Sequence, residues 1–252
     1  MNMITGNLAE LFGSIQGEGL YAGERQIFVR TAGCGMICDY CDTQYGQEIP
    51  EEFVIYGHKM KLFSNPIEVP TVMDEIAILK AEWAPVETVS ITGGEPLEQG
   101  DFVALLAREL QARNLRVYVD TNGVEVEGLS KVISHVDVVA TDFKLPSSCA
   151  GDHWDAHREF LRIANGAEVE IFIKVVIDTN TSDDEFIVAV DTVAETNHRI
   201  PLVLQPESGT LSAKTAAAQQ LMERVMAYQA MAAKRLETVR VIPQMHRILG
   251  VR

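Results

Sequence analysis

The sequence predicts an α/β fold in which strand–helix–strand units repeat around a mainly parallel sheet. Short apolar, β-branched segments recur from residue 25 to residue 244. Stretches with the periodicity of amphipathic helices separate these segments. The length of 252 residues suits one domain, residues 1–252, with loop insertions. Such units form either a closed or partly closed barrel or a sheet wound like a Rossmann fold.

Seven segments are expected to be buried strands. They are short, rich in β-branched residues and bounded by polar residues, Gly or Pro. They cover residues 25–32, 87–93, 115–123, 136–144, 168–177, 200–206 and 238–244. In both candidate architectures the ligand binds at the carboxyl ends of the strands, so motifs at these ends are candidates for the functional site.

Five helices are expected between the strands. They lie near residues 70–83, 101–113, 153–165, 182–197 and 210–236. In the last of them Leu221, Val225 and Tyr228 recur at spacings of three and four, which predicts one buried face. Ser182 and Glu185 have the spacing of a capping box at the start of the fourth helix.

Two segments do not follow this alternation. Residues 46–69 show no clear period and are interpreted as a loop or a small insertion. Before the first predicted strand, "LFGSIQGEGLYAGE" contains four glycines, and we expect a flexible, turn-rich lead.

Composition and charge exclude several classes of protein. The net charge of −15 disfavours binding to a nucleic-acid backbone, which rewards basic patches. The start has no basic residue followed by an apolar run, and Glu170 and Lys174 interrupt the longest apolar stretch. We therefore expect neither a signal peptide nor a membrane span, and we expect a cytoplasmic protein.

The stretch "AGCGMICDYCDT" concentrates three of the four cysteines, Cys34, Cys38 and Cys41. An accidental structural cluster is one explanation. A zinc site is a second, but it needs a fourth ligand, here His58 or the distant Cys149. The third is a cubane of four irons held by three thiolates, which leaves one iron open to an exogenous ligand. Outside a zinc site, His58 and Cys149 are interpreted as structural or solvent-facing.

The sequence "TGGEP", residues 92–96, ends a predicted strand and precedes a predicted helix. Gly93 and Gly94 permit a close backbone approach to a ligand, and Pro96 stiffens the turn. Glu95 could compensate a cationic amine. Alternatively, the motif is an ordinary strand-to-helix turn.

The two motifs together resemble those of radical S-adenosylmethionine (SAM) enzymes. "CGMICDYC" resembles their cluster signature, and "TGGEP" resembles their motif after the second core strand, which contacts the methionine amino group. Further likeness, in "SIQGEG", "CDT", "VDTNG", "DFKLPSS", "LQPE" and "RVIPQMHRILG", extends over almost the whole chain. These segments resemble the 7-carboxy-7-deazaguanine synthase family of radical SAM enzymes.

The resemblance implies a modified, incomplete (β/α) barrel of the radical SAM type. It implies a carbon–nitrogen lyase that contracts the ring of 6-carboxy-5,6,7,8-tetrahydropterin to 7-carboxy-7-deazaguanine with loss of ammonia, on the path to queuosine. The implied cofactors are a 4Fe–4S cluster, SAM and Mg²⁺, with the radical chemistry supplied by the cofactor. The implied partners are the small pterin substrate, a flavodoxin- or ferredoxin-type reductant and a second copy in a homodimer.

The resemblance also implies a role for each residue that matches a family motif. The cluster ligands would be Cys34, Cys38 and Cys41, and Thr43 would bind Mg²⁺. The substrate positions are Ile15, Gln16, Gly17, Arg30 and Thr92. The SAM positions are Tyr40, Asp42, Gly94, Asp142, Phe143, Lys144 and Gln205. No catalytic side chain beyond the cluster and SAM is implied. For Arg30 there is also a physical reason, since a guanidinium pairs bidentately with a carboxylate.

This sequence departs from one branch of the family, which has Ser-Pro-Lys where this chain has Asp142, Phe143 and Lys144. Two rival functions are an activase for a glycyl-radical enzyme and a zinc-stabilised binding module without catalysis. The opening "SIQGEG" and the lack of an added ferredoxin-type cysteine set disfavour the activase.

Overall fold

The protein is described by a computed structural model that covers residues 4–41, 43–213 and 215–252. Ten strands form one sheet in the order β12-β11-β10-β9-β8-β7-β3-β2-β4-β5. Seven neighbouring strands pair in parallel, and each overlaps a predicted strand: β3 (Arg25–Thr31), β7 (Thr88–Gly93), β8 (Arg116–Thr121), β9 (Val138–Phe143), β10 (Glu170–Ile177), β11 (Leu202–Pro206) and β12 (Val239–Val241). Within the described residues β12 and β5 do not pair with each other, so the sheet is an open, incomplete barrel, as predicted.

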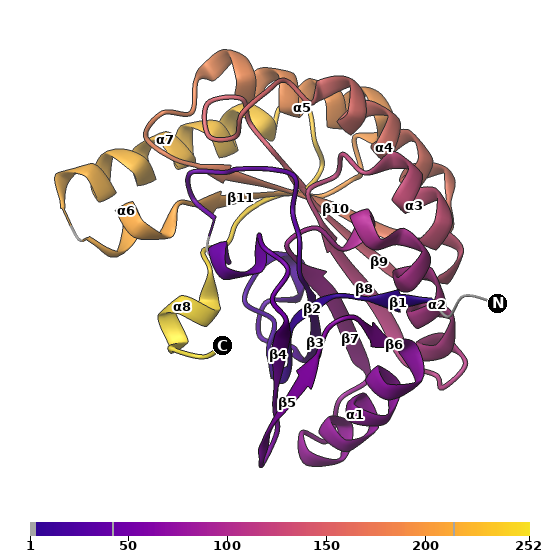
Figure 1. Cartoon of the computed structure of the whole chain (residues 1–252). Helices are drawn as coiled ribbons and strands as arrows, with labels where there is room; N and C mark the ends of the chain where they lie inside the picture. Colours follow the sequence, from indigo (N-terminus) through magenta and orange to yellow (C-terminus); the bar gives the residue numbers. More distant parts are fainter. Residues whose placement is uncertain (1–3, 42, 214) are drawn as a thin grey trace.

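Helices cover the outside of this sheet. The eight α-helices of the described ranges are α1 (Val69–Glu82), α2 (Gly100–Gln111), α3 (Val126–Val132), α4 (Trp154–Gly166), α5 (Asp183–Asn197), α6 (Ser208–Ser212), α7 (Ala216–Ala232) and α8 (Met245–Leu249). Figure 1 shows α2, α3, α4, α5 and α7 as an arc along the outer face, whereas α8 lies on the inner side. The capping box of α5 is present as predicted, because Ser182 Oγ accepts from the Glu185 N–H and the Glu185 carboxylate accepts from the Ser182 N–H.

Two helix predictions were inaccurate. The helix expected over residues 210–236 is divided into α6 and α7, and α7 begins only at Ala216. The buried face predicted for it does exist in α7, where Leu221, Val225 and Tyr228 are buried. The short helix α3 was missed, since seven residues are too few to show a helical period.

The segment 46–69 is not merely a loop. It forms a hairpin of β4 (Glu52–Tyr56) and β5 (Met60–Ser64), which extends the sheet, and the short β6 (Ile67–Glu68), which pairs with β1 (Thr5–Gly6). In β4 the buried Phe53 and Ile55 alternate with more exposed residues. This period of two holds for only five residues, which is why it was not recognised in the sequence.

The glycine-rich lead also contains a strand that was not predicted. The strand β2 (Leu8–Ile15) pairs antiparallel with β3 and parallel with β4, and most of it is buried. At Gly13 a Cβ atom would lie 2.5 Å from the Trp83 ring. The glycine in this strand therefore makes room for an aromatic ring and does not mark a turn.

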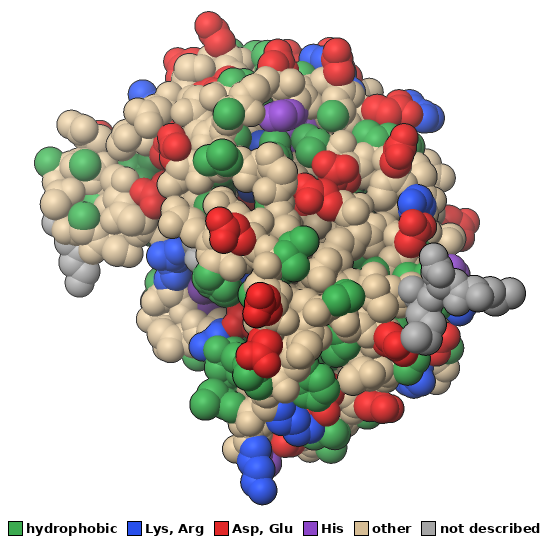
Figure 2. All heavy atoms as spheres, in the orientation of Figure 1, with side chains coloured by type: hydrophobic (Ala, Val, Ile, Leu, Met, Phe, Trp, Pro, Cys, Tyr) green, Lys and Arg blue, Asp and Glu red, His purple; other side chains and the backbone are tan. Residues whose placement is uncertain are grey.

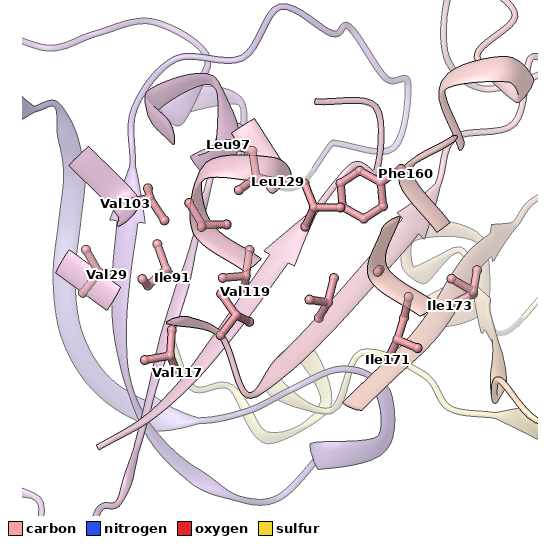
Figure 3. Close-up of a cluster of buried hydrophobic side chains, with 14 of the residues drawn as sticks. Val29, Ile91, Leu97, Val103, Val117, Val119, Leu129, Phe160, Ile171 and Ile173 are labelled. Carbon is pink, nitrogen blue, oxygen red and sulfur yellow. The ribbon is translucent and has the colours of Figure 1, made fainter. Parts of the chain in front are cut away.

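The hydrophobic core lies between the sheet and the outer helices. Figure 3 shows side chains of β3, β7, β8 and β10, among them Val29, Ile91, Val119 and Ile173, facing Leu129 of α3 and Phe160 of α4. Acidic side chains are spread over the visible surface in Figure 2, in keeping with the net charge of −15. None of the helices in the described ranges combines the length and the apolar character that crossing a bilayer requires.

Candidate functional site

A cleft opens at the carboxyl ends of the parallel strands, where the strand rule predicts a ligand site. It encloses about 1090 Å³ of space, including its open mouth. Its walls come from β2, β3, β7, β8, β9, β10 and β11, from the cysteine loop (residues 33–41) and from the C-terminal segment 244–252.

The cysteine loop brings all three predicted cluster ligands, Cys34, Cys38 and Cys41, to this cleft. Cys34 and Cys41 are free thiols, whereas Cys38 forms a disulfide with Cys149. Among the residues that the structure describes, no three His, Cys, Asp or Glu side chains are gathered as a metal site. The thiols therefore share one cleft without converging, and Cys38 would have to leave the disulfide to bind iron.

Cys149 is thus bonded to one of the predicted cluster ligands. Of the two expectations, structural or solvent-facing, burial fits the structural one, since its side chain is 2% exposed; its bond to Cys38 was not expected. The sequence separation of 111 positions hides this proximity in the sequence. His58, in contrast, is exposed, as one of the two expectations had it.

The glycines of "TGGEP" pack against the cysteine loop. Gly94 N–H donates to the Thr31 carbonyl at 3.0 Å, and Glu95 N–H donates to the Gly33 carbonyl at 2.8 Å. A Cβ atom on Gly94 would lie only 2.0 Å from the Gly33 carbonyl oxygen. The close approach that was predicted toward a ligand is, in this structure, an approach between two backbone segments.

Glu95 joins two turns at the strand ends. Its carboxylate accepts from Thr121 Oγ1 at 2.8 Å and from the backbone N–H groups of Asn122 and Leu97 at 2.7 and 3.0 Å. Burial raises the pKa of Glu95 to about 7, although these three hydrogen bonds act in the opposite direction. In the structure this carboxylate holds the "TGGEP" and "VDTNG" turns together.

The five predicted substrate positions all line the cleft: Ile15, Gln16, Gly17, Arg30 and Thr92. The Nε of Arg30 lies 2.8 Å from Glu10 Oε1. Tyr45 donates to the same carboxylate at 2.7 Å, and Arg252 forms an ion pair with it. The Arg30 guanidinium, which was predicted to bind a substrate carboxylate, is therefore held in place by the carboxylate of Glu10.

Five of the seven predicted SAM positions also line the cleft: Tyr40, Gly94, Asp142, Lys144 and Gln205. Asp42 lies outside the described residues. The Phe143 side chain does not reach the cleft but is buried in the core, with its ring centroid 4.4 Å from that of His157. The alternation of side chains along β9 explains this, since Asp142 and Lys144 face the cleft and Phe143 must face the other side.

Among the residues that the structure describes, three buried polar atoms on the cleft wall have no hydrogen-bond partner: Asn122 Nδ2, Asp142 Oδ1 and Gln205 Oε1. A buried polar group without a partner is costly, so such groups indicate a place for a polar ligand. Two of these atoms, on Asp142 and Gln205, belong to predicted SAM positions, and they fit a cofactor that carries hydroxyl and amino groups.

Thr43 lines the same cleft, and its Oγ1 lies 3.9 Å from Cys41 Sγ. It occupies the N-cap position of a short 3-10 helix, Gln44–Gly46, but its side chain makes no capping hydrogen bond. The hydroxyl therefore does not cap this helix.

A buried ion triad on the cleft floor was missed by the sequence reasoning. Lys174 Nζ lies 2.7 Å from Glu18 Oε2 and 2.9 Å from Asp120 Oδ1, and its side chain is 3% exposed. These carboxylates raise the pKa of Lys174 despite its burial, so it stays charged. The available signal was a lysine inside the apolar strand "IFIKVVI", which only a charged partner could tolerate.

The C-terminal segment was also missed as part of the site. His246 and Arg252 line the cleft, and Met245 N–H donates to the Gly17 carbonyl at 2.8 Å. A Cβ atom on Gly17 would lie 2.0 Å from His246 Nδ1. The glycine at this predicted substrate position is therefore required for the tail to close over β2.

Comparison with known proteins gives consistent results. Residues 28–193 match the Radical SAM superfamily. The 7-carboxy-7-deazaguanine synthase of Geobacter sulfurreducens is 40% identical, over 96% of each chain. That of Methanothermobacter thermautotrophicus is 31% identical over 100% of each. Among solved structures, QueE from Escherichia coli aligns with a TM-score of 0.60 at 21% identity, over 96% of this chain and 95% of that one, which is a likeness of fold.

Proposed function

The chain belongs to the radical SAM superfamily and, within it, to the 7-carboxy-7-deazaguanine synthase family, and we propose that it carries out the reaction of that family. The reaction is the ring contraction of 6-carboxy-5,6,7,8-tetrahydropterin to 7-carboxy-7-deazaguanine with loss of ammonia. One observation carries this proposal: the 40% identity to the Geobacter sulfurreducens enzyme extends over 96% of both chains. A relationship confined to the cluster motif would support only a shared cofactor.

The thiols of Cys34, Cys38 and Cys41 would hold the 4Fe–4S cluster, and three thiolates are the donor set that leaves one iron for SAM. When bound, the cluster and SAM supply a one-electron cleavage that starts radical chemistry at carbon. The protein's own residues position the reactants. Tyr40, Asp42, Gly94, Asp142, Phe143, Lys144 and Gln205 are the proposed SAM positions, with Phe143 able to contribute only its backbone because its side chain is in the core.

Recognition of the pterin would use a second set of residues in the same cleft. Ile15, Gln16, Gly17, Arg30 and Thr92 are the proposed substrate positions, all on the cleft. The Arg30 guanidinium, held by Glu10, offers its remaining N–H donors to the substrate carboxylate. The stacked rings of Phe12 and Phe28, with centroids 5.0 Å apart, give this part of the cleft an apolar surface.

For Thr43 we propose a role as a magnesium ligand. The hydroxyl makes no capping bond and lies on the cleft, and a hard cation needs oxygen ligands. Substrate oxygens and waters would have to complete the shell. We expect Thr43→Ala to weaken the Mg²⁺ dependence of turnover without lowering the iron content, whereas an unchanged Mg²⁺ response would remove Thr43 from the site.

The remaining expectations complete the proposal. A flavodoxin- or ferredoxin-type protein would supply the electron, two copies would form a homodimer, and the product would enter queuosine synthesis in the cytoplasm. The exposed Ile37 on the cysteine loop gives a reductant an apolar contact close to the cluster ligands.

Reconstitution under anaerobic conditions tests the cofactor part of the proposal. We expect about four irons and four sulfides per chain and a reduced-state electron paramagnetic resonance spectrum that changes when SAM is added. One tightly held zinc, with no response to SAM, would contradict it and favour a binding module. The same preparation then serves for the turnover measurement.

A further inference from the structure

Cys38 and Cys149 are held face to face by the backbone around them. Their Cα atoms are 4.4 Å apart, and the two residues form an isolated antiparallel bridge. Beside the bridge, Asp39 N–H donates to the Ser148 carbonyl at 3.0 Å. The separation lies within the range of protein disulfides, so the sulfurs can join without movement of the backbone.

The Cys149 side of this pair is fixed to the rest of the fold. Ser148 Oγ donates to Asp178 Oδ2 at 2.8 Å, at the end of β10, and Ser147 N–H donates to Glu185 Oε2 at 3.0 Å, in α5. The Cys149 side chain is 2% exposed, whereas Cys38 is half-buried and lines the cleft. An oxidant can therefore reach Cys38, and the buried sulfur of Cys149 lies next to it.

A sulfur atom in a disulfide cannot at the same time be a thiolate ligand of iron. We propose that Cys38 and Cys149 are a redox modification site: in the cluster-free protein they form a reversible disulfide that excludes the cluster until a thiol reductant opens it. The inference rests on the proposed function only in taking Cys38 as a cluster ligand. It assigns a role to Cys149, which the cluster motif does not use.

The chemistry balances with a peroxide as oxidant. The Cys38 thiolate attacks hydrogen peroxide, whose O–O bond breaks to give a sulfenic acid and hydroxide. The Cys149 thiol then attacks the Cys38 sulfur, the S–O bond breaks, and water leaves. In total two thiols lose two electrons and two protons, and peroxide is reduced to two waters. A dithiol reductant reverses the step by exchange. The disulfide thereby keeps Cys38 from irreversible oxidation to a sulfinic acid.

Thiol counting on the full chain tests the pairing. After anaerobic removal of iron, titration of the denatured protein should find all four cysteines as thiols. After one equivalent of hydrogen peroxide we expect two thiols. Mass spectrometry of a non-reduced tryptic digest should then join the peptide of residues 31–59 to that of residues 145–158, which contains Cys149.

Two matched variants identify the partner, because Cys34, Cys38 and Cys41 lie on the same tryptic peptide. Cys34→Ser should keep the cross-link, and Cys38→Ser should lose it. Absence of a cross-link in the wild type, or its persistence in Cys38→Ser, would overturn the proposal. The thiol counts and cross-links are measured without turnover. A failure of this proposal can therefore be distinguished from a failure of the proposed function.

A third variant tests the protective role. Wild-type protein treated with peroxide and then with a dithiol should recover its full iron content on reconstitution. In Cys149→Ser, Cys38 lacks a resolving thiol and should oxidise further, so most of the iron binding should be lost permanently. Equal recovery of iron by both proteins would refute protection by Cys149.

Discussion

At the scale of single residues, the cleft is organised by charged groups that the fold keeps internally paired. Arg30 is held by Glu10, Lys144 lies 2.8 Å from Asp142, and Lys174 joins Glu18 to Asp120. The motifs identified Arg30, Lys144 and Asp142 in the sequence. The pairing of Arg30 with Glu10 and the Lys174 triad were missed, because pairing across strands depends on distances in space that one sequence does not contain.

The buried triad gives the first prediction. Lys174→Met should lower the free energy of unfolding by about 3–5 kcal/mol, because Glu18 and Asp120 would lose their buried counter-ion. Urea unfolding of the full chain measures this loss in the free energy of unfolding. Lys131→Met is the matched control, since the Lys131–Asp101 pair is exposed and should cost less than about 1 kcal/mol. Equal losses in the two variants would contradict the role given to Lys174.

His157 gives a prediction about pH. Burial lowers the pKa of His157 to about 3, and the neutral ring bridges the Gly123 carbonyl and the Lys144 N–H. Because the folded-state pKa is below the unfolded value of about 6.5, the unfolded chain binds the extra proton between these values. Stability should therefore fall as pH drops below about 6.5 and should not respond to this group above it.

Substitution of His157 measures how much this residue contributes to the pH dependence of stability. His157→Gln should remove up to about 1.4 kcal/mol per pH unit from the slope of stability between pH 6 and 4.5. His58→Gln is the control for the removal of a histidine, because His58 is exposed. Unfolding free energies measured at several pH values decide it, and identical slopes for wild type and His157→Gln would show that His157 is not the titrating group.

At the scale of elements, the site depends on the contact between the "TGGEP" turn and the cysteine loop. The turn follows β7 and the loop follows β3, and these two strands are neighbours in the sheet. Strand neighbours could be expected from the alternating pattern, so the sequence could predict that the motifs meet. It could not predict that Gly94 meets the backbone of Gly33.

Gly94→Ala tests this contact. A methyl group would meet the Gly33 carbonyl, so the cysteine loop should shift, with a stability loss of about 1–3 kcal/mol and reduced iron retention. Gly166→Ala is the control, because a Cβ at this position in α4 meets no atom within 4 Å. Iron per chain after reconstitution is the measurement. Full iron content in Gly94→Ala would contradict a structural requirement for glycine here.

The elements that sequence reasoning missed share a physical cause. The strands β2 and β4 and the helix α3 are short or contain glycine, and their place is decided by partners distant in sequence. Trp83 packs at Gly13 of β2, and β4 completes a hairpin with β5. Tertiary contacts of this kind override the local pattern, whereas the seven parallel strands lie in β-branched segments bounded by polar residues, Gly or Pro, a pattern that the sequence shows by itself.

At the scale of the whole molecule, an open sheet of parallel strands directs its carboxyl ends into one cleft. Every predicted site residue whose side chain the structure describes, apart from Phe143, lines that cleft. This agreement follows from the rule that parallel strands end on the same edge. What the rule could not supply is the return of the C-terminal segment to the site, more than 200 residues after β2.

The central claim is that this cleft performs the ring contraction with a cluster held by Cys38. The most direct measurement is an anaerobic incubation of reconstituted protein with 6-carboxytetrahydropterin, SAM, Mg²⁺ and a chemical reductant, followed by detection of the deazaguanine chromophore and of ammonia. We predict equal amounts of both products from the wild type and none from Cys38→Ala, which should also fail to retain the cluster. Full turnover by Cys38→Ala, or no product from a wild type that holds an intact, SAM-responsive cluster, would contradict the account.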